Sequence, residues 1–205
     1  MKIAVENLGK RFNREWIFKK FDFVFEPGHC YAIVGPNGSG KSTLMQVLWG
    51  QVPASTGTIT YSNKEFTIPG EEAYKNVSIA TPYMELVEEF TLKEMVEFHF
   101  KFKRTFQNLP VAELAGLMGL GQARDKQISN FSSGMKQRLK LGLAFFSGTS
   151  ALFLDEPTTN LDKRAIAWYH EKLSEFGASR LVLIASNNEH EYPEKAQKVD
   201  LMSLK

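Results

Sequence analysis

The stretch "GPNGSGKST", Gly35 to Thr43, is the most informative segment of this 205-residue chain. It follows the apolar run "CYAIV" (30–34) and opens a helical pattern over 41–48. Its spacing satisfies G-x-x-x-x-G-K-[ST], in which glycines let the backbone turn tightly and direct consecutive N–H groups at phosphate oxygens. The positive end of the next helix adds to the attraction for an anion. The stretch therefore predicts a nucleoside triphosphate site between a strand and a helix.

Individual side chains of this loop have distinct expected roles. Lys41 has the length and charge to reach the β- and γ-phosphates, and the Ser42 hydroxyl can coordinate Mg²⁺. We therefore predict a nucleoside triphosphate and Mg²⁺ as the ligands. The predicted phosphate-binding residues are Gly35, Pro36, Asn37, Gly38, Ser39, Gly40, Lys41, Ser42 and Thr43.

A second acidic site supports the first. The stretch "ALFLDEP" places Asp155 and Glu156 at the end of an apolar run over 151–154. An aspartate there can hold Mg²⁺ through a water, and the next carboxylate can orient or deprotonate the attacking water. A strand that ends in two acids is weak evidence by itself, but together with the glycine-rich loop it predicts metal binding by Asp155 and catalysis by Glu156.

The rest of the chain alternates short β-rich runs with helical patterns, which is typical of an α/β domain. The runs 151–154 and 181–185, like 30–34, are continuously apolar, as expected for strands covered on both faces of a mostly parallel sheet. The run 21–25 alternates and predicts a half-buried strand. Further helices are expected at about 133–146 and 163–176.

Between about 91 and 130 the sequence predicts an inserted helical lobe. Thr91 with Glu94 three residues later forms a capping-box signature. The stretch 97–106, "EFHFKFKRTF", has both strand and helical periodicity, and we favour a helix. We interpret its phenylalanines as core residues and its lysines as solvated; base stacking on nucleic acid is the alternative. His99, like His29 and His170, is expected to be structural or solvated.

Composition excludes several classes of protein. The apolar content of 43% and the formal charge of +2 are ordinary for a globular domain and predict no nucleic-acid partner. The single cysteine, Cys30, excludes an intrachain disulfide framework and is expected on a buried strand. No apolar run approaches the ~18 to 20 residues of a membrane span, and we expect a cytoplasmic protein without a signal peptide.

With these motifs the chain resembles the nucleotide-binding subunits of ATP-binding-cassette (ABC) transporters over nearly its whole length. The resemblance rests on "GPNGSGKST", "FSSGMKQR" (131–138), "FLDEPTTNLD" (153–162) and "LVLIASNNEHEYPEK" (181–195). It implies an α/β fold of the P-loop NTPase type, with a mostly parallel sheet core, an antiparallel β subdomain and the inserted helical lobe. It also implies that 1–205 is a single ABC ATPase domain.

The family's mechanism implies a head-to-tail dimer, formed with a second copy or with a related chain. The signature of one chain then caps the γ-phosphate held by the other. Here Phe131, Ser133 and Met135 depart from the usual L-S-G-G-Q pattern, whereas Ser132 and Gly134 match it. The resemblance assigns ATP contacts to Ser132, Ser133 and Gly134, and partner-site contacts to Asn160 and Asp162.

Near the amino terminus, Phe12 falls where the family usually has an aromatic residue stacked on adenine. Stacking on a base contributes ~1 to 3 kcal/mol. Core packing of Phe12 and a stacking role for Trp16 are the alternatives.

Two positions depart from the family. Tyr83, or otherwise Pro82, stands where a glutamine usually binds Mg²⁺ and senses the transport partner. A phenol can hydrogen-bond a metal-bound water but does not closely replace a carboxamide. Asn187 stands where a histidine usually contacts the γ-phosphate, and His190 is three residues further on, too far to substitute without a loop shift. Asn187 can donate a neutral hydrogen bond but cannot carry a proton.

The resemblance implies an ATP-hydrolysing subunit at the inner face of the cell membrane, peripheral to separate integral-membrane subunits. The groove beside Tyr83 and the helical lobe would receive those subunits. Two alternatives remain: a regulatory module that binds ATP with little hydrolysis, and a non-transport ABC ATPase that acts on a ribosome or DNA. The coiled-coil insertions and basic extensions usual in the latter are absent from the sequence.

Overall fold

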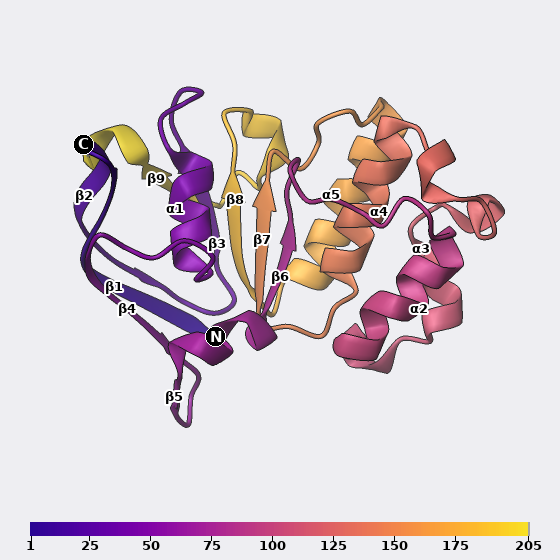
Figure 1. Ribbon diagram of the computed structural model, residues 1–205, viewed down its shortest axis with the longest axis horizontal. Helices are drawn as coiled ribbons and strands as arrows, with labels where there is room; N and C mark the ends of the chain where they lie inside the picture. Colours follow the sequence, from indigo (N-terminus) through magenta and orange to yellow (C-terminus); the bar gives the residue numbers. More distant parts are fainter. Residues whose placement is uncertain (205) are drawn as a thin grey trace.

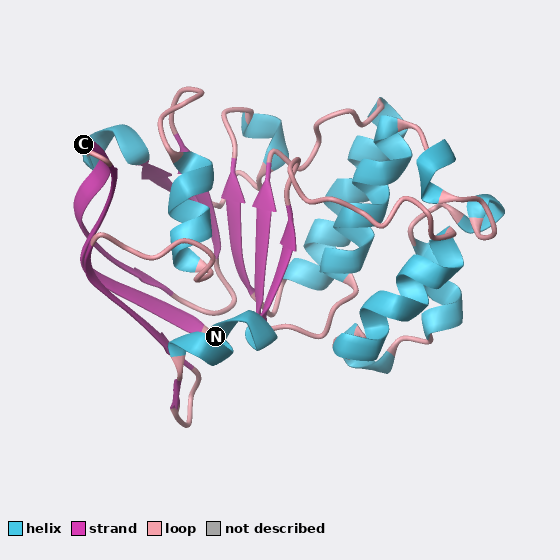
Figure 2. Ribbon diagram, in the orientation of Figure 1, coloured by secondary structure: helices cyan, strands magenta, loops and turns pink. Residues whose placement is uncertain are grey.

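The computed structural model describes residues 1–204 and contains two sheets (Figures 1 and 2). The antiparallel sheet has the order β2-β1-β4-β5 and the parallel sheet the order β6-β7-β8-β3-β9. Every strand pairing in the second sheet is parallel. The strands are β1 (Lys2–Phe12), β2 (Glu15–Phe25), β3 (Cys30–Val34), β4 (Thr56–Ser62), β5 (Thr67–Ile68), β6 (Val77–Ala80), β7 (Ala151–Asp155), β8 (Leu181–Ala185) and β9 (Gln197–Asp200).

Helices cover both faces of the parallel sheet (Figure 1). The helix after the glycine-rich loop lies between the two sheets, and the two longest helices cover the opposite face. The α-helices are α1 (Lys41–Leu48), α2 (Leu92–Phe102), α3 (Leu114–Leu117), α4 (Ser133–Phe145) and α5 (Lys163–Gly177). The 3₁₀ helices are η1 (Gly70–Asn76), η2 (Phe106–Asn108), η3 (Val111–Glu113), η4 (Gly121–Ala123), η5 (Ile128–Asn130), η6 (Glu189–Glu191) and η7 (Leu201–Leu204).

Two hydrophobic cores lie on either side of the parallel sheet. Successive side chains of a strand point to opposite faces, so Leu152 and Leu154 of β7 enter the core with α4 and α5. Ala151 and Phe153 enter the core with α1 and the antiparallel sheet. All five residues of β7 and of β8 are buried, which explains their continuously apolar sequences.

The structure confirms the predicted strands at 30–34, 151–154 and 181–185 and the three helices after the predicted motifs. The alternating run 21–25 is the end of β2, and its burial alternates as expected. Cys30 begins β3, and burial raises the pKa of its thiol to about 12. Among residues 1–204, no helix is both long enough and apolar enough to span a membrane.

Helix α2 forms as predicted, and the strand interpretation of this stretch is wrong. The Thr91 hydroxyl oxygen accepts from the Glu94 backbone N–H at 3.2 Å. The Glu94 carboxylate in turn accepts from the Thr91 backbone N–H at 2.8 Å, which completes the capping box.

The prediction of core phenylalanines in α2 is wrong at two positions. Phe98 is 42% exposed and Phe102 is 76% exposed. Leu92, Met95 and Val96 occupy the buried face of the helix, and helical spacing therefore turns the two phenylalanines outward. Their rings cover each other in part, with centroids 5.2 Å apart.

Lys103, expected in solvent, is instead partly buried. Its ammonium donates to the Val77 carbonyl. Burial lowers the pKa of Lys103.

His99 has the structural role predicted for it. Its Nε2 lies 3.0 Å from the Ser147 hydroxyl oxygen. That hydroxyl donates its own proton to the Leu143 carbonyl at 2.6 Å, so it must accept from His99 Nε2–H. Burial, and secondarily the charge of Lys103, lowers the pKa of His99 from 6.5 to about 4.

The folded chain therefore binds a proton at His99 less readily than the unfolded chain does. The contribution of neutral His99 to the free energy of unfolding is therefore complete above pH 6.5 and is lost as the pH falls from 6.5 towards about 4. Between pH 7 and pH 5, we expect wild-type stability to fall about 1 to 2 kcal/mol more than that of His99→Gln. Urea unfolding at the two pH values measures this difference. Gln at the exposed His170 is the matched control, and an equal pH effect in all three proteins would contradict the assignment.

Candidate nucleotide-binding site

Three strand ends meet at one edge of the parallel sheet. In the β7–β8 pairing Asp155 lies opposite Ala185, and in the β3–β8 pairing Ile33 lies opposite Ala185. The chain leaves all three strands in the same direction, so the loops that follow them share this edge. The glycine-rich loop, Glu156 and Asn187 are the segments brought together there.

The glycine-rich loop depends on backbone conformations that favour glycine. Gly35, Gly38 and Gly40 have φ values of 147°, 75° and 105°. A Cβ atom on Gly40 would lie 2.1 Å from Cγ2 of Ile17. The last glycine before α1 is therefore fixed both by its φ and by close packing against β2.

Lys41 is held inside the loop. Its Nζ donates to the Gly35 carbonyl at 2.9 Å and to the Pro36 carbonyl at 3.2 Å, and the residue is 6% exposed. These bonds place the ammonium beneath the glycine-rich backbone, where a phosphate would meet it. The conformation fits the predicted role of Lys41 as a phosphate ligand, which stays a prediction.

Asp155 has the chemistry that a divalent cation needs. It is 2% exposed, and one oxygen, Oδ1, has no hydrogen-bond partner within residues 1–204. Burial raises the pKa of Asp155, whereas a hydrogen bond from Ser42 lowers it and the Glu156 charge raises it. A buried, unpartnered carboxylate oxygen beside a hydroxyl fits Mg²⁺, because a cation would offset the cost of burial. Ser42 and Asp155 would hold the ion.

Glu156 has a strained backbone next to this carboxylate. Its φ of 43° is unusual for a residue with a side chain, and its N–H donates to the Ala185 carbonyl at 2.9 Å. This bond to the end of β8 keeps the strained turn in place. The backbone of Glu156 is therefore fixed at the edge of the sheet, and its side chain is half-buried there.

Asn187 is bonded directly to the glycine-rich loop. Its Nδ2 donates to Oδ1 of Asn37 at 2.6 Å, although the two residues are 150 positions apart. The bond places the Asn187 amide beside the region where the loop would hold a γ-phosphate. His190, by contrast, lies in η6 and is exposed.

Glu191 is part of the site's support and gave no signal in the sequence. It is 4% exposed, and its carboxylate accepts from the Thr158 backbone N–H at 2.9 Å and from the Thr158 hydroxyl. The Tyr169 hydroxyl donates to the Glu191 carbonyl at 2.7 Å. These bonds tie the segment after Glu156 to the segment after Asn187. Thr158 and Glu191 are 33 positions apart, and a single sequence does not reveal such a pairing.

The predicted signature residues lie apart from this edge, at the start of α4. The Ser132 hydroxyl oxygen accepts from the Met135 N–H at 3.2 Å and caps the helix. A Cβ on Gly134 would lie 2.9 Å from the Asn160 carbonyl oxygen, so these two segments approach closely. Asp162 caps α5 through a 2.7 Å bond from the Ala165 N–H. One open cavity is lined by Ser132, Ser133, Gly134, Asn160 and Asp162, without any residue of the glycine-rich loop.

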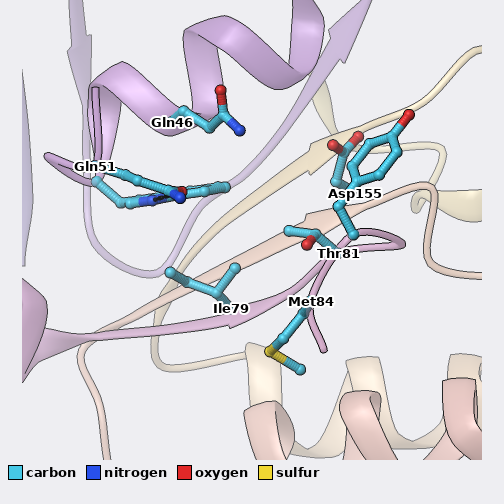
Figure 3. Close-up of a pocket in the computed structure, with 8 residues that line it drawn as sticks. Gln46, Gln51, Ile79, Thr81, Met84 and Asp155 are labelled. Atoms are coloured by element: carbon cyan, nitrogen blue, oxygen red, sulfur yellow. Dashed lines mark hydrogen bonds between the residues drawn. The ribbon is translucent and has the colours of Figure 1, made fainter. Parts of the chain in front are cut away.

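The two remaining predicted contacts are exposed. Phe12 is 49% exposed at the end of β1, which excludes core packing for it. The Lys10 ammonium lies 4.7 Å from its ring centroid. Trp16 instead lies beside Arg11, whose guanidinium is 5.5 Å from the indole ring. Tyr83 is 81% exposed in the loop after β6 and lines a cavity together with Asp155 (Figure 3).

Comparison with known proteins identifies the family. The sequence model of the family described as ABC transporter matches residues 18–159, which is more than half of the chain. The chain belongs to the ABC transporter family. This stretch of the ABC chain begins in β2 and ends just after Glu156, so it includes both the glycine-rich loop and the signature segment.

Related proteins extend the match over nearly all of this ABC chain. It is 29% identical to the uncharacterized ABC transporter ATP-binding protein YybJ of Bacillus subtilis, over 92% of this chain and 87% of that protein. It is also 29% identical to the lantibiotic transport ATP-binding protein SrtF of Streptococcus pyogenes, over 91% and 80%. A solved structure from Pyrococcus furiosus, a putative ABC transporter ATP-binding protein, has the same fold with a TM-score of 0.82. It covers 100% of this chain and 99% of its own at 15% identity.

The position of Lys41 leads to a direct test of nucleotide binding. We expect Lys41→Ala to weaken ATP binding at least ~100-fold, because the buried ammonium is the charge closest to the expected β- and γ-phosphates. Isothermal titration calorimetry measures this affinity. Alanine at the exposed Lys64, between β4 and β5, is the matched control and should leave the affinity unchanged. If Lys41→Ala binds ATP with the wild-type affinity, the assignment of the loop as the phosphate-binding site is wrong.

Proposed function

We propose that this ABC chain binds ATP with Mg²⁺, hydrolyses it, and thereby powers transport through separate integral-membrane subunits. The observation that carries the proposal is the buried carboxylate of Asp155, whose Oδ1 has no hydrogen-bond partner within residues 1–204, followed by Glu156 at the sheet edge that the glycine-rich loop shares. Mg²⁺ held at Ser42 and Asp155 would neutralise charge on the phosphates during transfer.

Each group of the site has a separate role in the proposed hydrolysis. The glycine-rich backbone and Lys41 hold the β- and γ-phosphates and stabilise their negative charge. Glu156 orients a water for attack and accepts its proton as the new P–O bond forms and the bond to the β-phosphate oxygen breaks. ADP and inorganic phosphate are the products. Asn187 turns its amide from Asn37 to the γ-phosphate and donates a neutral hydrogen bond.

The separation of the signature from the glycine-rich loop supports a two-chain site. Ser132, Ser133 and Gly134 open on a cavity that contains no residue of their own phosphate loop. A second ABC chain, identical or related, would bring its own phosphate loop to this cavity. Asn160 and Asp162, which line the same cavity, would contact that partner.

The proposed role in transport is inferred from the family to which the chain belongs. SrtF and YybJ are named as ATP-binding proteins of transporters. We infer the same division of labour here, with the chain lying peripherally on the cytoplasmic face of the membrane. A groove lined by Pro82, Tyr83 and Leu86 of the loop after β6, and by Lys136 and Lys140 of α4, is the surface on which a membrane subunit would dock.

A second candidate is a regulatory ABC module that turns ATP over slowly. Two residues favour it: Asn187 cannot carry a proton, and the exposed Tyr83 has no carboxamide with which to bind a metal-bound water. In this version the chain closes on ATP and an active partner performs most of the hydrolysis.

Glu156→Gln should reduce kcat for ATP at least ~100-fold, because an amide cannot accept the proton of the attacking water. Phosphate release from purified protein with Mg-ATP measures the rate. Gln at Glu175, which is exposed on α5, should leave the rate unchanged. If the wild-type protein turns over no ATP, with or without its membrane subunits, the enzymatic part of the proposal fails.

Asn187→His should raise kcat about tenfold, since an imidazole at this position can carry and return a proton at neutral pH. Steady-state ATPase assays of the two proteins compare the rates. His190→Ala serves as the control and should have no effect, because His190 is exposed in η6. A rate unchanged by Asn187→His would show that a neutral hydrogen bond is sufficient.

A further inference from the structure

A cavity of about 200 Å³ lies between α1 and the loop that follows β6 (Figure 3). It is large enough for several water molecules, each of which takes about 30 Å³ in the liquid. The buried Asp155 forms one end of it. The other lining residues are Gln46, Trp49, Gln51, Ile79, Thr81, Tyr83 and Met84.

Gln46 shares a helix face with the predicted metal ligand Ser42. The two residues are four positions apart in α1, and such residues lie one above the other on a helix. Helical side chains lean towards the N-terminus, which directs Gln46 back towards Ser42. Figure 3 shows the Gln46 carboxamide reaching into the cavity on the side of Asp155.

The two glutamines of the cavity differ in their partners. The Gln51 carboxamide oxygen accepts from the indole N–H of Trp49 at 3.0 Å. The Gln46 side chain makes no hydrogen bond to any of residues 1–204, and neither does Asp155 Oδ1. Two oxygen-bearing groups without protein partners therefore line the same water-sized cavity.

We propose that Gln46 holds a water molecule of the divalent cation bound by Ser42 and Asp155. The inference rests on the proposed function and adds a positioning residue to it. Residues four positions apart are separated by about 6 Å along the helix axis. The Gln46 side chain and one water molecule together can bridge this distance. Mg²⁺ usually retains several of its waters, and a carboxamide oxygen is a suitable acceptor for them. A residue of α1 thus supplies the carboxamide that Tyr83 lacks.

The test measures metal affinity and does not rely on turnover. Mn²⁺ is titrated into protein saturated with a non-hydrolysable ATP analogue, and electron paramagnetic resonance reports free and bound Mn²⁺. Gln46→Ala should raise the Kd for Mn²⁺ about tenfold, the lower range for loss of an outer-shell partner. Its affinity for the nucleotide in the absence of metal should not change. Alanine favours helix, so α1 is retained.

Two further variants make the result specific. Gln51→Ala, the matched control in the same cavity, should leave the Kd for Mn²⁺ unchanged. Tyr83→Gln combined with Gln46→Ala should restore most of the affinity, because the carboxamide then comes from the loop side of the cavity. A Gln46→Ala protein with wild-type affinity for Mn²⁺, or an equal loss in Gln51→Ala, would overturn the inference.

The same measurements separate the inference from the proposed function. If wild-type protein binds and hydrolyses ATP but Gln46→Ala has the wild-type Kd for Mn²⁺, only the role of Gln46 is wrong. If wild-type protein binds no nucleotide, both proposals are overturned.

Discussion

Parallel pairing of β3, β8 and β7 is the constraint on which the site depends. Because all three strands run in the same direction, the segments after Val34, Asp155 and Ala185 emerge together although they are far apart in the chain. Burial on both faces fixes this register, since each strand sends alternate side chains into two separate cores. A one-residue slip would exchange these faces and displace Asp155 from Ser42.

The site stores unfavourable features that a nucleotide and its cation would relieve. Burial of Asp155 disfavours its charge, and Glu156 adds a second negative charge beside it. The left-handed backbone of Glu156 and the glycine-dependent turns of the phosphate loop are conformations that the surrounding sheet must hold. The hydrogen bonds of Thr158 to Glu191 hold the two neighbouring loops together. The rest of the fold must therefore offset the free-energy cost of holding these groups in place.

Much of this arrangement could be predicted from the sequence because it depends on local patterns. The glycine spacing, the apolar strand runs and the Thr91 capping box each act within a few residues, and the structure contains all three elements. The α2 phenylalanines could not be placed, because periodicity identifies a helix but not which of its apolar stripes meets the core. Leu92, Met95 and Val96 took the buried face. The bonds of Asn187 to Asn37 and of Thr158 to Glu191 join distant residues, and no local pattern encodes such pairs. Gln46 appears in the sequence as an ordinary helical residue, and only the cavity beside Asp155 gives it a role.

The proposed mechanism requires two chains to complete one ATP site from opposite motifs. The most direct measurement is a crystal structure of the Glu156→Gln protein, alone or with a related chain, grown with Mg-ATP. We expect a head-to-tail pair with two nucleotides, each γ-phosphate lying between Lys41 and Asn187 of one chain and Ser132 of the other. A nucleotide bound away from Lys41, or one at Lys41 with Ser132 of every chain facing solvent, would exclude this two-chain site.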